Sequence, residues 1–295
     1  MDVICATAGR VVKTLPGGKP IVGVTDDNDY VYVLRGCISN QIEIYDKICY
    51  KLQRKISVPG LGLARDIAAC DINRCAYISD EDNRCVRRVV LRGGAVTYWP
   101  VNDQPAGLSV TETQSLLVTC SEVRKVKEFS TDGKPLRQIQ LPKDVIKPWH
   151  TIQLSRQQLL VCHGEGSGPE DLHRVCLIDR KVLKSYGGSH GSGTEQMSVP
   201  FHFAVGRDKF GFGGWYQYGF EGKCVFVADR GNSRVLLLSP SLTYICEFLS
   251  RNQLNGYPKR LCFDRCHSRL YVAVNGFEGE RVVVCELICS LTASY

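Results

Sequence analysis

The histidines are the residues of this 295-residue chain whose types and spacing most suggest chemistry, because five of the six lie between positions 150 and 202. His150 and His202 each follow a proline by two residues, at equivalent places in neighbouring units of a sequence repeat. Imidazoles from adjacent units, with a carboxylate such as Glu165 or Glu195 near by, form a common ligand set for divalent metals. The spacing therefore predicts a metal site with His150 and His202 as ligands, taking Zn or Ca.

The opposing interpretation is that the mouth of a channel is polar and wet, so that histidine is simply tolerated there. Lewis-acid chemistry at a metal would also need an open coordination position and a base. The sequence assigns no such base, and we predict no catalytic residue. In the main interpretation no cofactor is expected, and the divalent metal belongs to the alternative.

Basic residues form a second candidate site, at matching places in the second and third repeat units. The residues are Arg84, Arg87, Arg88, Arg124, Lys125 and Lys127, and Arg260 adds charge at the channel opening. A continuous rim of this kind would bind phosphates in a salt-dependent way. The formal net charge of +7 permits such binding without requiring it, so an ordinary solvated surface is the alternative.

Aromatic residues form a third candidate site, in a glycine-rich insertion at residues 206–223. Phe212, Trp215 and Tyr216 lie close to basic residues there, and aromatic rings beside cations can stack unpaired bases. The alternative is that these rings pack together as the small core of a compact loop.

Several other chemistries find no support in the sequence. The glycine-rich run at residues 187–193 has no following Lys-Ser or Lys-Thr, so it does not predict a phosphate loop. The fifteen cysteines are odd in number and contain no CxxC pair, which argues against a disulfide framework and a zinc knuckle. Many of them lie in apolar strands, where cysteine acts as a small hydrophobe. We therefore expect a reducing, cytoplasmic setting.

The elements that must hold these residues recur about six times, once every 40 to 58 residues. Each unit opens with proline or a small residue and a short apolar strand, and two further strands follow after turns. Residues 224–240, CVFVADRGNSRVLLLSP, form the clearest copy. A repeat of this length with several short strands is typical of a propeller. The predicted fold is an all-β, six-bladed β-propeller with four-stranded blades.

We expect a single domain over residues 1–295, because the repeat runs nearly from end to end. The predicted blades are 20–58, 63–101, 105–141, 148–186, 200–249 and 258–287, and the last lacks an outer strand of its own. Residues 9–15 resemble one, so we predict that the N-terminal strand pairs with the last blade and closes the ring, which removes exposed sheet edges. The chain begins in mid-pattern, which predicts a fragment or the tail of a longer protein.

The segment VFVADRGNSRVLLLSPSL, which starts at Val225, resembles the NHL repeat in its apolar strand, Asp229, Asn232, Arg234 and second apolar strand. Residues 80–84, DEDNR, match more weakly. The resemblance implies a six-bladed propeller similar to the C-terminal domains of TRIM-NHL proteins, which bind RNA or proteins. The Pro-x-His pattern at His150 and His202 faintly resembles the amidating lyase family, whose propeller holds a metal with channel histidines.

Taken together, these features predict a non-catalytic recognition platform that binds a protein or single-stranded RNA partner. It would be the substrate-recognition part of a ubiquitin-ligase-type protein, monomeric as a domain. The alternative is a channel-centred metal-dependent hydrolase or lyase, and a further alternative is a structural spacer module. No run approaches the roughly 20 apolar residues of a membrane-spanning helix, so no membrane partner is expected.

Overall fold

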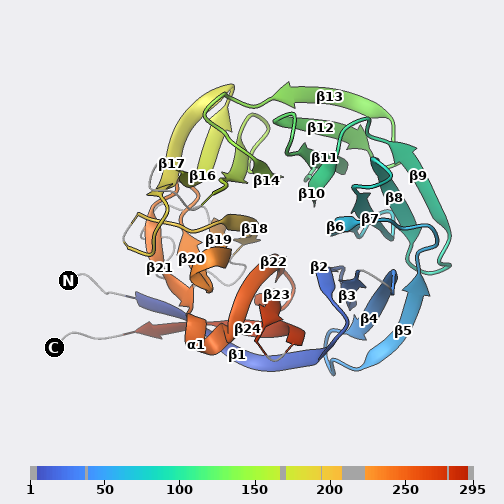
Figure 1. Cartoon of the computed structure of the whole chain (residues 1–295). Helices are drawn as coiled ribbons and strands as arrows, with labels where there is room; N and C mark the ends of the chain where they lie inside the picture. Colours follow the sequence, from blue (N-terminus) through green and yellow to red (C-terminus); the bar gives the residue numbers. More distant parts are fainter. Residues whose placement is uncertain are drawn as a thin grey trace.

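The computed structural model describes residues 5–36, 39–166, 171–193, 195–207, 223–277 and 279–291. Six sheets of four antiparallel strands each surround a common axis in a closed ring (Figure 1). Among the described residues, helix is limited to α1 (Arg251–Leu254) and one short 3-10 turn at Arg230–Asn232. This arrangement confirms the predicted six-bladed all-β propeller.

The strands of each blade follow one another from the axis outward. The innermost strands are β2 (Ile21–Asp26), β6 (Ala64–Cys70), β10 (Pro105–Val110), β14 (Pro148–Gln153), β18 (Pro200–Arg207) and β22 (Gly256–Asp264). The second strands are β3 (Tyr30–Arg35), β7 (Cys75–Asp80), β11 (Ser115–Cys120), β15 (Leu159–His163), β19 (Lys223–Asp229) and β23 (Arg269–Gly276). The third strands are β4 (Gln41–Asp46), β8 (Cys85–Val90), β12 (Lys125–Ser130), β16 (Leu172–Asp179), β20 (Arg234–Leu238) and β24 (Gly279–Leu291).

The outer strands are β5 (Leu52–Ser57), β9 (Val96–Pro100), β13 (Pro135–Gln140), β17 (Lys181–Ser189) and β21 (Tyr244–Leu249) in blades one to five. Blade six takes its outer strand from the other end of the chain, because β1 (Cys5–Gly18) pairs antiparallel with β24. Gly9 lies opposite Leu287 in this pairing. The predicted closure is confirmed, and it is longer than the expected 9–15.

The hydrophobic core lies between neighbouring blades. Six clusters of buried side chains fill the six blade interfaces, and the one between blades six and one includes Leu15, Val33 and Tyr271. Each sheet carries apolar side chains on both faces, because a neighbouring blade covers each face. Among the cysteines whose side chains the structure describes, eight are buried, where cysteine packs as a small apolar residue.

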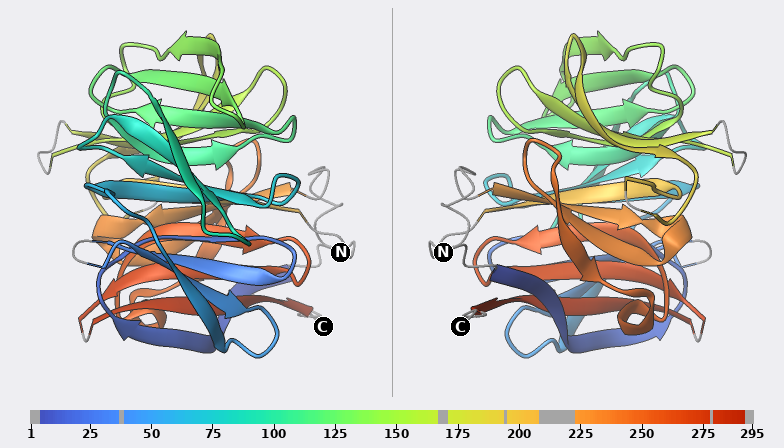
Figure 2. Two further views of the ribbon diagram at one scale, coloured as in Figure 1. Left: turned by 90° about the vertical axis from the view of Figure 1, so that its right-hand side faces the viewer. Right: turned by 90° about the vertical axis from the view of Figure 1, so that its left-hand side faces the viewer.

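The strands run across the thickness of the ring, so the connections gather on its two faces (Figure 2). One face carries the connections between first and second strands, and we call it the cavity face. The opposite face carries the connections between second and third strands. Within the part of the chain that the structure describes, no helix is long and apolar enough to cross a membrane.

Candidate functional site

The innermost strands share a register irregularity just after their first residue, and the third residue of each strand forms a ring around the axis. For β22 the count starts at Pro258, where the repeat unit opens. The ring consists of Gly23, Asp66, Gly107, His150, His202 and Arg260. Its four polar side chains are buried and meet one another, and we call them the polar floor.

Contacts within the polar floor are close. The His150 and His202 rings stack with their centroids 3.7 Å apart and their planes 16° apart. Asp66 lies between two partners, with the Arg260 Nε 2.9 Å from Oδ1 and the His202 Nε2 3.4 Å from Oδ2. The structure therefore places the two imidazoles side by side, as expected from their positions in the repeat. It adds Asp66, which the sequence analysis did not single out.

The two glycines of the ring make room for the polar floor. A Cβ atom on Gly107 would lie 2.5 Å from the Trp149 carbonyl oxygen and 2.8 Å from the His150 Cα. A Cβ on Gly23 would lie 2.7 Å from the Ile67 Cγ2. Four polar side chains can meet at the axis because two blades contribute no side chain at this level.

Hydrogen bonds fix the proton positions of the two imidazoles. The Leu261 amide donates to the Nδ1 of His202 at 3.2 Å, so the proton of the neutral ring is on Nε2, facing Asp66. The Nε2 of His150 lies 3.0 Å from the Leu108 carbonyl oxygen and must carry a proton to donate to it. The Nδ1 of His150 is then an acceptor, and it is buried without a hydrogen-bond partner among the described residues.

Burial and neighbouring charges agree with these assignments. Burial lowers the pKa of His150 well below its usual value, and His202 lowers it further. Burial also lowers the pKa of His202, although Asp66 opposes this. Burial disfavours the charged form of Asp66, but Arg260 and His202 outweigh it and hold the pKa well below its usual range. The floor at neutral pH is therefore a carboxylate–guanidinium ion pair beside two neutral imidazoles.

The polar floor contains both histidines of the predicted metal site. One ligand atom from each of Asp66, His150 and His202 can be chosen so that all three lie within 4.8 Å of one another. However, the Nε2 of His202 carries its proton, and its Nδ1 lone pair accepts the Leu261 amide. Arg260 already neutralises the carboxylate and would repel a cation. The donor set suits a hydrogen-bonded floor better than a metal centre, because only the Nδ1 of His150 offers an unused lone pair.

A cavity of about 550 Å³ lies on one side of the polar floor and opens on the cavity face. His150 and His202 line its inner end. Small side chains line its middle at equivalent positions of five blades, namely Thr25, Ala68, Ser109, Ala204 and Cys262. The cavity exists because these five blades place no bulky residue at that level.

The opposite side of the floor is closed by aromatic rings. Trp149 and Phe201 lie 4.9 Å apart, and the Arg260 guanidinium lies 4.7 Å from the Phe201 ring. A much smaller cavity of about 100 Å³ remains there. A ligand of the central cavity must therefore enter from the cavity face.

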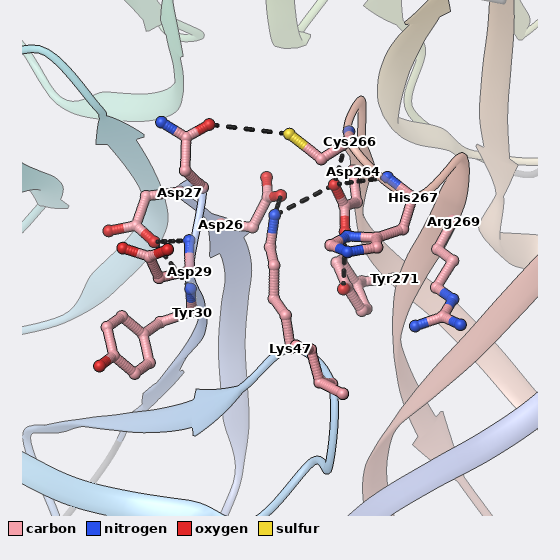
Figure 3. Close-up of polar contacts among 12 residues, drawn as sticks. Asp26, Asp27, Asp29, Tyr30, Lys47, Asp264, Cys266, His267, Arg269 and Tyr271 are labelled. Atoms are coloured by element: carbon pink, nitrogen blue, oxygen red, sulfur yellow. Dashed lines mark hydrogen bonds and ion pairs between the residues drawn. The ribbon is translucent and has the colours of Figure 1, made fainter. Parts of the chain in front are cut away.

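The mouth of the cavity is acidic, although the whole chain is basic. Five carboxylates and two basic side chains line the cavity, namely Asp26, Asp27, Asp71, Glu112, Asp264, Lys47 and Arg265. Lys47 is buried between Asp26 and Asp264, and its Nζ lies 3.1 Å from the Asp264 Oδ1 (Figure 3). Burial raises the pKa of Asp26 to about 6, and Lys47 only partly opposes this. Lys47, the fully buried cation of the mouth, is thus already paired with two of the mouth carboxylates.

Two of the predicted phosphate-binding residues hold the blades together instead of facing solvent. The Arg87 Nε lies 2.6 Å from the Asp80 Oδ2, and its other nitrogens donate to the carbonyls of Pro59 and Gly60. Lys127 pairs with Asp103 at 2.6 Å. Each side chain therefore ties its blade to the connection that enters it.

Blade one keeps this tether with the charges exchanged. Arg35 at the end of β3 takes the position of Asp80, and Glu43 on β4 takes the position of Arg87. The Arg35 Nε lies 2.8 Å from the Glu43 Oε2, and Arg35 also donates to the carbonyls of the incoming connection. In both blades an arginine pairs with a carboxylate and donates to carbonyls of the incoming connection, but the two residues have exchanged strands. No sequence motif therefore reveals that the two ion pairs are equivalent.

The other predicted residues are placed as follows. Arg84 is exposed on the face opposite the cavity, and Arg88, Arg124 and Lys125 are half-buried. The Nη1 of Arg124 donates to the Lys143 carbonyl. Arg260 belongs to the polar floor. Phe212, Trp215 and Tyr216 lie outside the described residues.

Comparison with known proteins supports the fold. A streptogramin B lyase structure matches with a TM-score of 0.61 and 10% identity, over 96% of this chain and 98% of that one. A catalytically inactive virginiamycin B lyase from Staphylococcus aureus with quinupristin matches with a TM-score of 0.64 and 12% identity, over 96% and 100%. Hydrazine synthase of Kuenenia stuttgartiensis matches with a TM-score of 0.55 and 14% identity, over 92% and 76%. At these identities the likeness concerns the fold alone.

The sequence comparisons assign no family. No profile of a known protein family matches the chain. The phosphodiesterase YfcE of Escherichia coli K12 is 27% identical over 126 residues, which are 43% of this chain and 66% of that protein. The match thus spans slightly less than two thirds of the phosphodiesterase. What the fold supports at the coarse level is a scaffold for binding or recognition, an arrangement that commonly mediates protein interactions.

Proposed function

We propose that this chain is a non-catalytic recognition module and that it binds a protein partner on the cavity face. The observation that carries the proposal is the 550 Å³ cavity, which is open at an acidic mouth and closed at the polar floor. The charged groups of that floor satisfy one another, since Asp66 is paired with Arg260 and hydrogen-bonded to His202. Such a floor can hold and orient a ligand without supplying an activated nucleophile.

Charge favours protein over RNA as the partner. A phosphate entering the cavity would meet five carboxylates, and like-charge contacts suppress wrong partners. Arg87, Lys127 and Arg260 are engaged within the propeller, which weakens the basic rim as a phosphate site. Ile72 lines the cavity with 72% of its surface exposed, and it offers an apolar contact beside the acidic mouth.

The proposal includes an NHL-like origin for the blades. The Asn232 Nδ2 lies 2.7 Å from the Asp229 Oδ2 in blade five, and the Asn83 Nδ2 lies 2.8 Å from the Asp80 Oδ2 in blade two. The same side-chain pair at the same turn of two blades supports the resemblance. We therefore propose that the chain is the recognition part of a TRIM-like, cytoplasmic ubiquitin-ligase-type protein.

A photo-crosslinking experiment tests the partner and its location. The crosslinking residue p-benzoylphenylalanine replaces Ile72 at the cavity mouth, or Leu136 on the outer strand β13 as the matched control, which is 51% exposed. We expect a protein adduct from Ile72 alone, with its identity given by mass spectrometry and the binding reproduced with the purified partner. An adduct with RNA, or equal adducts from both positions, would contradict the proposal.

The second candidate function is a channel-centred metal-dependent hydrolase or lyase. It is favoured by the convergence of Asp66, His150 and His202 within 4.8 Å, and by a fold shared with lyases. In that case the Nδ1 of His150 would be the first ligand, and a bound metal would act as a Lewis acid. The metal content of the purified protein separates this candidate from the recognition module.

A further inference from the structure

We propose that the cavity face carries a second binding site, separate from the central cavity, which takes the phosphorylated tyrosine of a protein segment. The site is a pocket of about 490 Å³ between blades three and four, and we call it the side pocket. Its basic lining residues are Arg137, Arg156 and Arg180. The site goes beyond the proposed function, which concerns the central cavity alone.

Two of the three arginines are available to a ligand. Arg156 lies in the connection between β14 and β15, and Arg180 directly follows β16. Both side chains are exposed, and neither makes a hydrogen bond or an ion pair with another residue of the described part. A guanidinium group only donates, and its planar fork matches the oxygens of a phosphate. An anionic ligand in the side pocket would therefore meet two donors that the protein itself does not use.

The third arginine is held in position by a buried carboxylate. The Nε of Arg137 donates to the Oε2 of Glu128, which is 7% exposed. Its Nη1 and Nη2 atoms have no partner among the residues that the structure describes, so they can donate to a ligand. A side chain that is fixed before binding loses less conformational freedom on binding, which favours affinity.

The inner wall of the side pocket suits an aromatic ring. Leu159 is 5% exposed and Ile178 is 2% exposed, and half-buried Ile139 shares the Arg137 face of β13. The intervening Leu136 projects from the other face of that strand. The pocket thus combines apolar walls with exposed guanidinium groups, and phosphotyrosine combines a ring with a phosphate of about two negative charges. The volume falls within the roughly 300–1,000 Å³ of pockets that bind small groups.

The equivalent pocket between blades one and two shows what distinguishes the side pocket. It has a similar volume of about 480 Å³ and is also lined by three arginines, namely Arg54, Arg74 and Arg92. Arg54 corresponds to Arg137, because each pairs with the third strand beside the same register irregularity. However, both Nη atoms of Arg54 donate to backbone carbonyls. Three aspartates also line that pocket, whereas the described lining of the side pocket contains one carboxylate, Asp179.

The charges of the cavity face favour a single phosphate over a nucleic-acid backbone. Five carboxylates line the central cavity on the same face, so a chain with one phosphate per nucleotide would meet like charges there. A protein segment can carry one phosphate into the side pocket and neutral residues elsewhere. Recognition of phosphorylated segments by clustered arginines is a recurring mode of peptide binding.

Peptide binding to the intact purified chain tests this inference. The probe is a fluorescein-labelled peptide of glycine and serine with one central phosphotyrosine, and the control peptides carry tyrosine or glutamate at that position. Fluorescence anisotropy gives the Kd for the wild-type chain, for Arg156→Gln/Arg180→Gln and for Asp179→Asn. Arg92→Gln is the matched control from the pocket between blades one and two. These side chains are exposed or half-buried, so the variants should fold.

We expect saturable binding of the phosphotyrosine peptide only. Its Kd should rise about tenfold with Arg156→Gln/Arg180→Gln, because two charged donors to the phosphate are lost from an exposed site. Asp179→Asn should lower the Kd about threefold, since it removes the carboxylate that opposes the phosphate. Arg92→Gln should leave the Kd unchanged.

Three results would overturn the inference. The first is equal affinity for the phosphotyrosine peptide and either control peptide. The second is a Kd that Arg156→Gln/Arg180→Gln does not change. The third is tighter binding of a labelled hexauridine RNA, which would make these arginines part of a nucleic-acid surface. The crosslink expected at Ile72 does not depend on these arginines, so a failure of the proposed function and a failure of the side pocket are observed separately.

Discussion

Replacing Arg87 by leucine should reveal how strongly the tethers hold the propeller together. Arg87 is 8% exposed, and Asp80 is fully buried. The substitution keeps apolar volume but removes the ion pair and the hydrogen bonds to the Pro59 and Gly60 carbonyls. Asp80 would retain only its bonds from Asn83 and the Gly62 amide.

The expected magnitude follows from the burial of the pair. Removing one partner of a buried ion pair leaves an uncompensated charge and costs about 3–5 kcal/mol. That is a large part of the roughly 5–15 kcal/mol that stabilises a folded domain. Burial opposes ionisation of Asp80, but Arg87 and Asn83 outweigh it and hold the pKa of Asp80 below its usual value. The stability that depends on the charged form is therefore lost as pH falls, so the difference between variant and wild type should narrow below a pH of about 3.9.

Urea denaturation followed by circular dichroism measures the difference in the free energy of unfolding. The matched control is the double variant Asp80→Arg/Arg87→Glu, which copies the Arg35–Glu43 arrangement of blade one. We expect this exchange to recover about half of the loss, because a cation again faces the Pro59 carbonyl. Two results would show that Arg87 does not hold its blade to the incoming connection. One is a loss of unfolding free energy below about 1 kcal/mol for Arg87→Leu, and the other is a double variant less stable than the single one.

Three further predictions follow from the channel. Gly107→Ala places a Cβ 2.8 Å from the His150 Cα and should lower stability by about 1–3 kcal/mol in urea denaturation, whereas Gly93→Ala, with open space around it, should be neutral. In the folded protein the pKa of Asp26 is raised to about 6, so its contribution to the free energy of unfolding is lost as pH rises from about 4 to 6. Urea titrations across this pH range should show that Asp26→Asn removes about 2–3 kcal/mol of that pH dependence. Elemental analysis should find no stoichiometric metal in wild type or in His150→Ala/His202→Ala, and one metal per chain lost in the variant would favour the metalloenzyme.

The fold was predictable from the sequence because each blade repeats its own local signals. Proline or a small residue at the start of the inner strand and turn residues after the later strands mark the blades without any long-range information. The length of the closing pair was not predictable in this way. β1 reaches Cys5–Gly18 and β24 reaches Leu291, since two strands from opposite ends of the chain extend each other through pairing. Where such a strand ends depends on the strand with which it pairs, and a local sequence pattern does not show that partner.

The floor was only partly predictable, and the tethers were not. Equivalent positions in two repeats were enough to bring His150 and His202 together. The same alignment contains Asp66 and Arg260 at the third position, so the ring was visible in the sequence, but their pairing across the axis depends on the closure of the ring. The sequence predicts Arg87 as a surface cation because its partner Asp80 lies on another strand. The pairing of β7 with β8 brings the two side chains together.

The two ends of the channel explain why recognition should use one face. Trp149 and Phe201 close one side of the polar floor, and Arg260 packs on Phe201 while it binds Asp66. A fully paired buried ion pair contributes little to stability over an apolar core of the same volume. Its consequence here is a fixed, polar inner end for a cavity that small residues keep open. The carboxylates at the other end are then the first groups that an approaching partner meets.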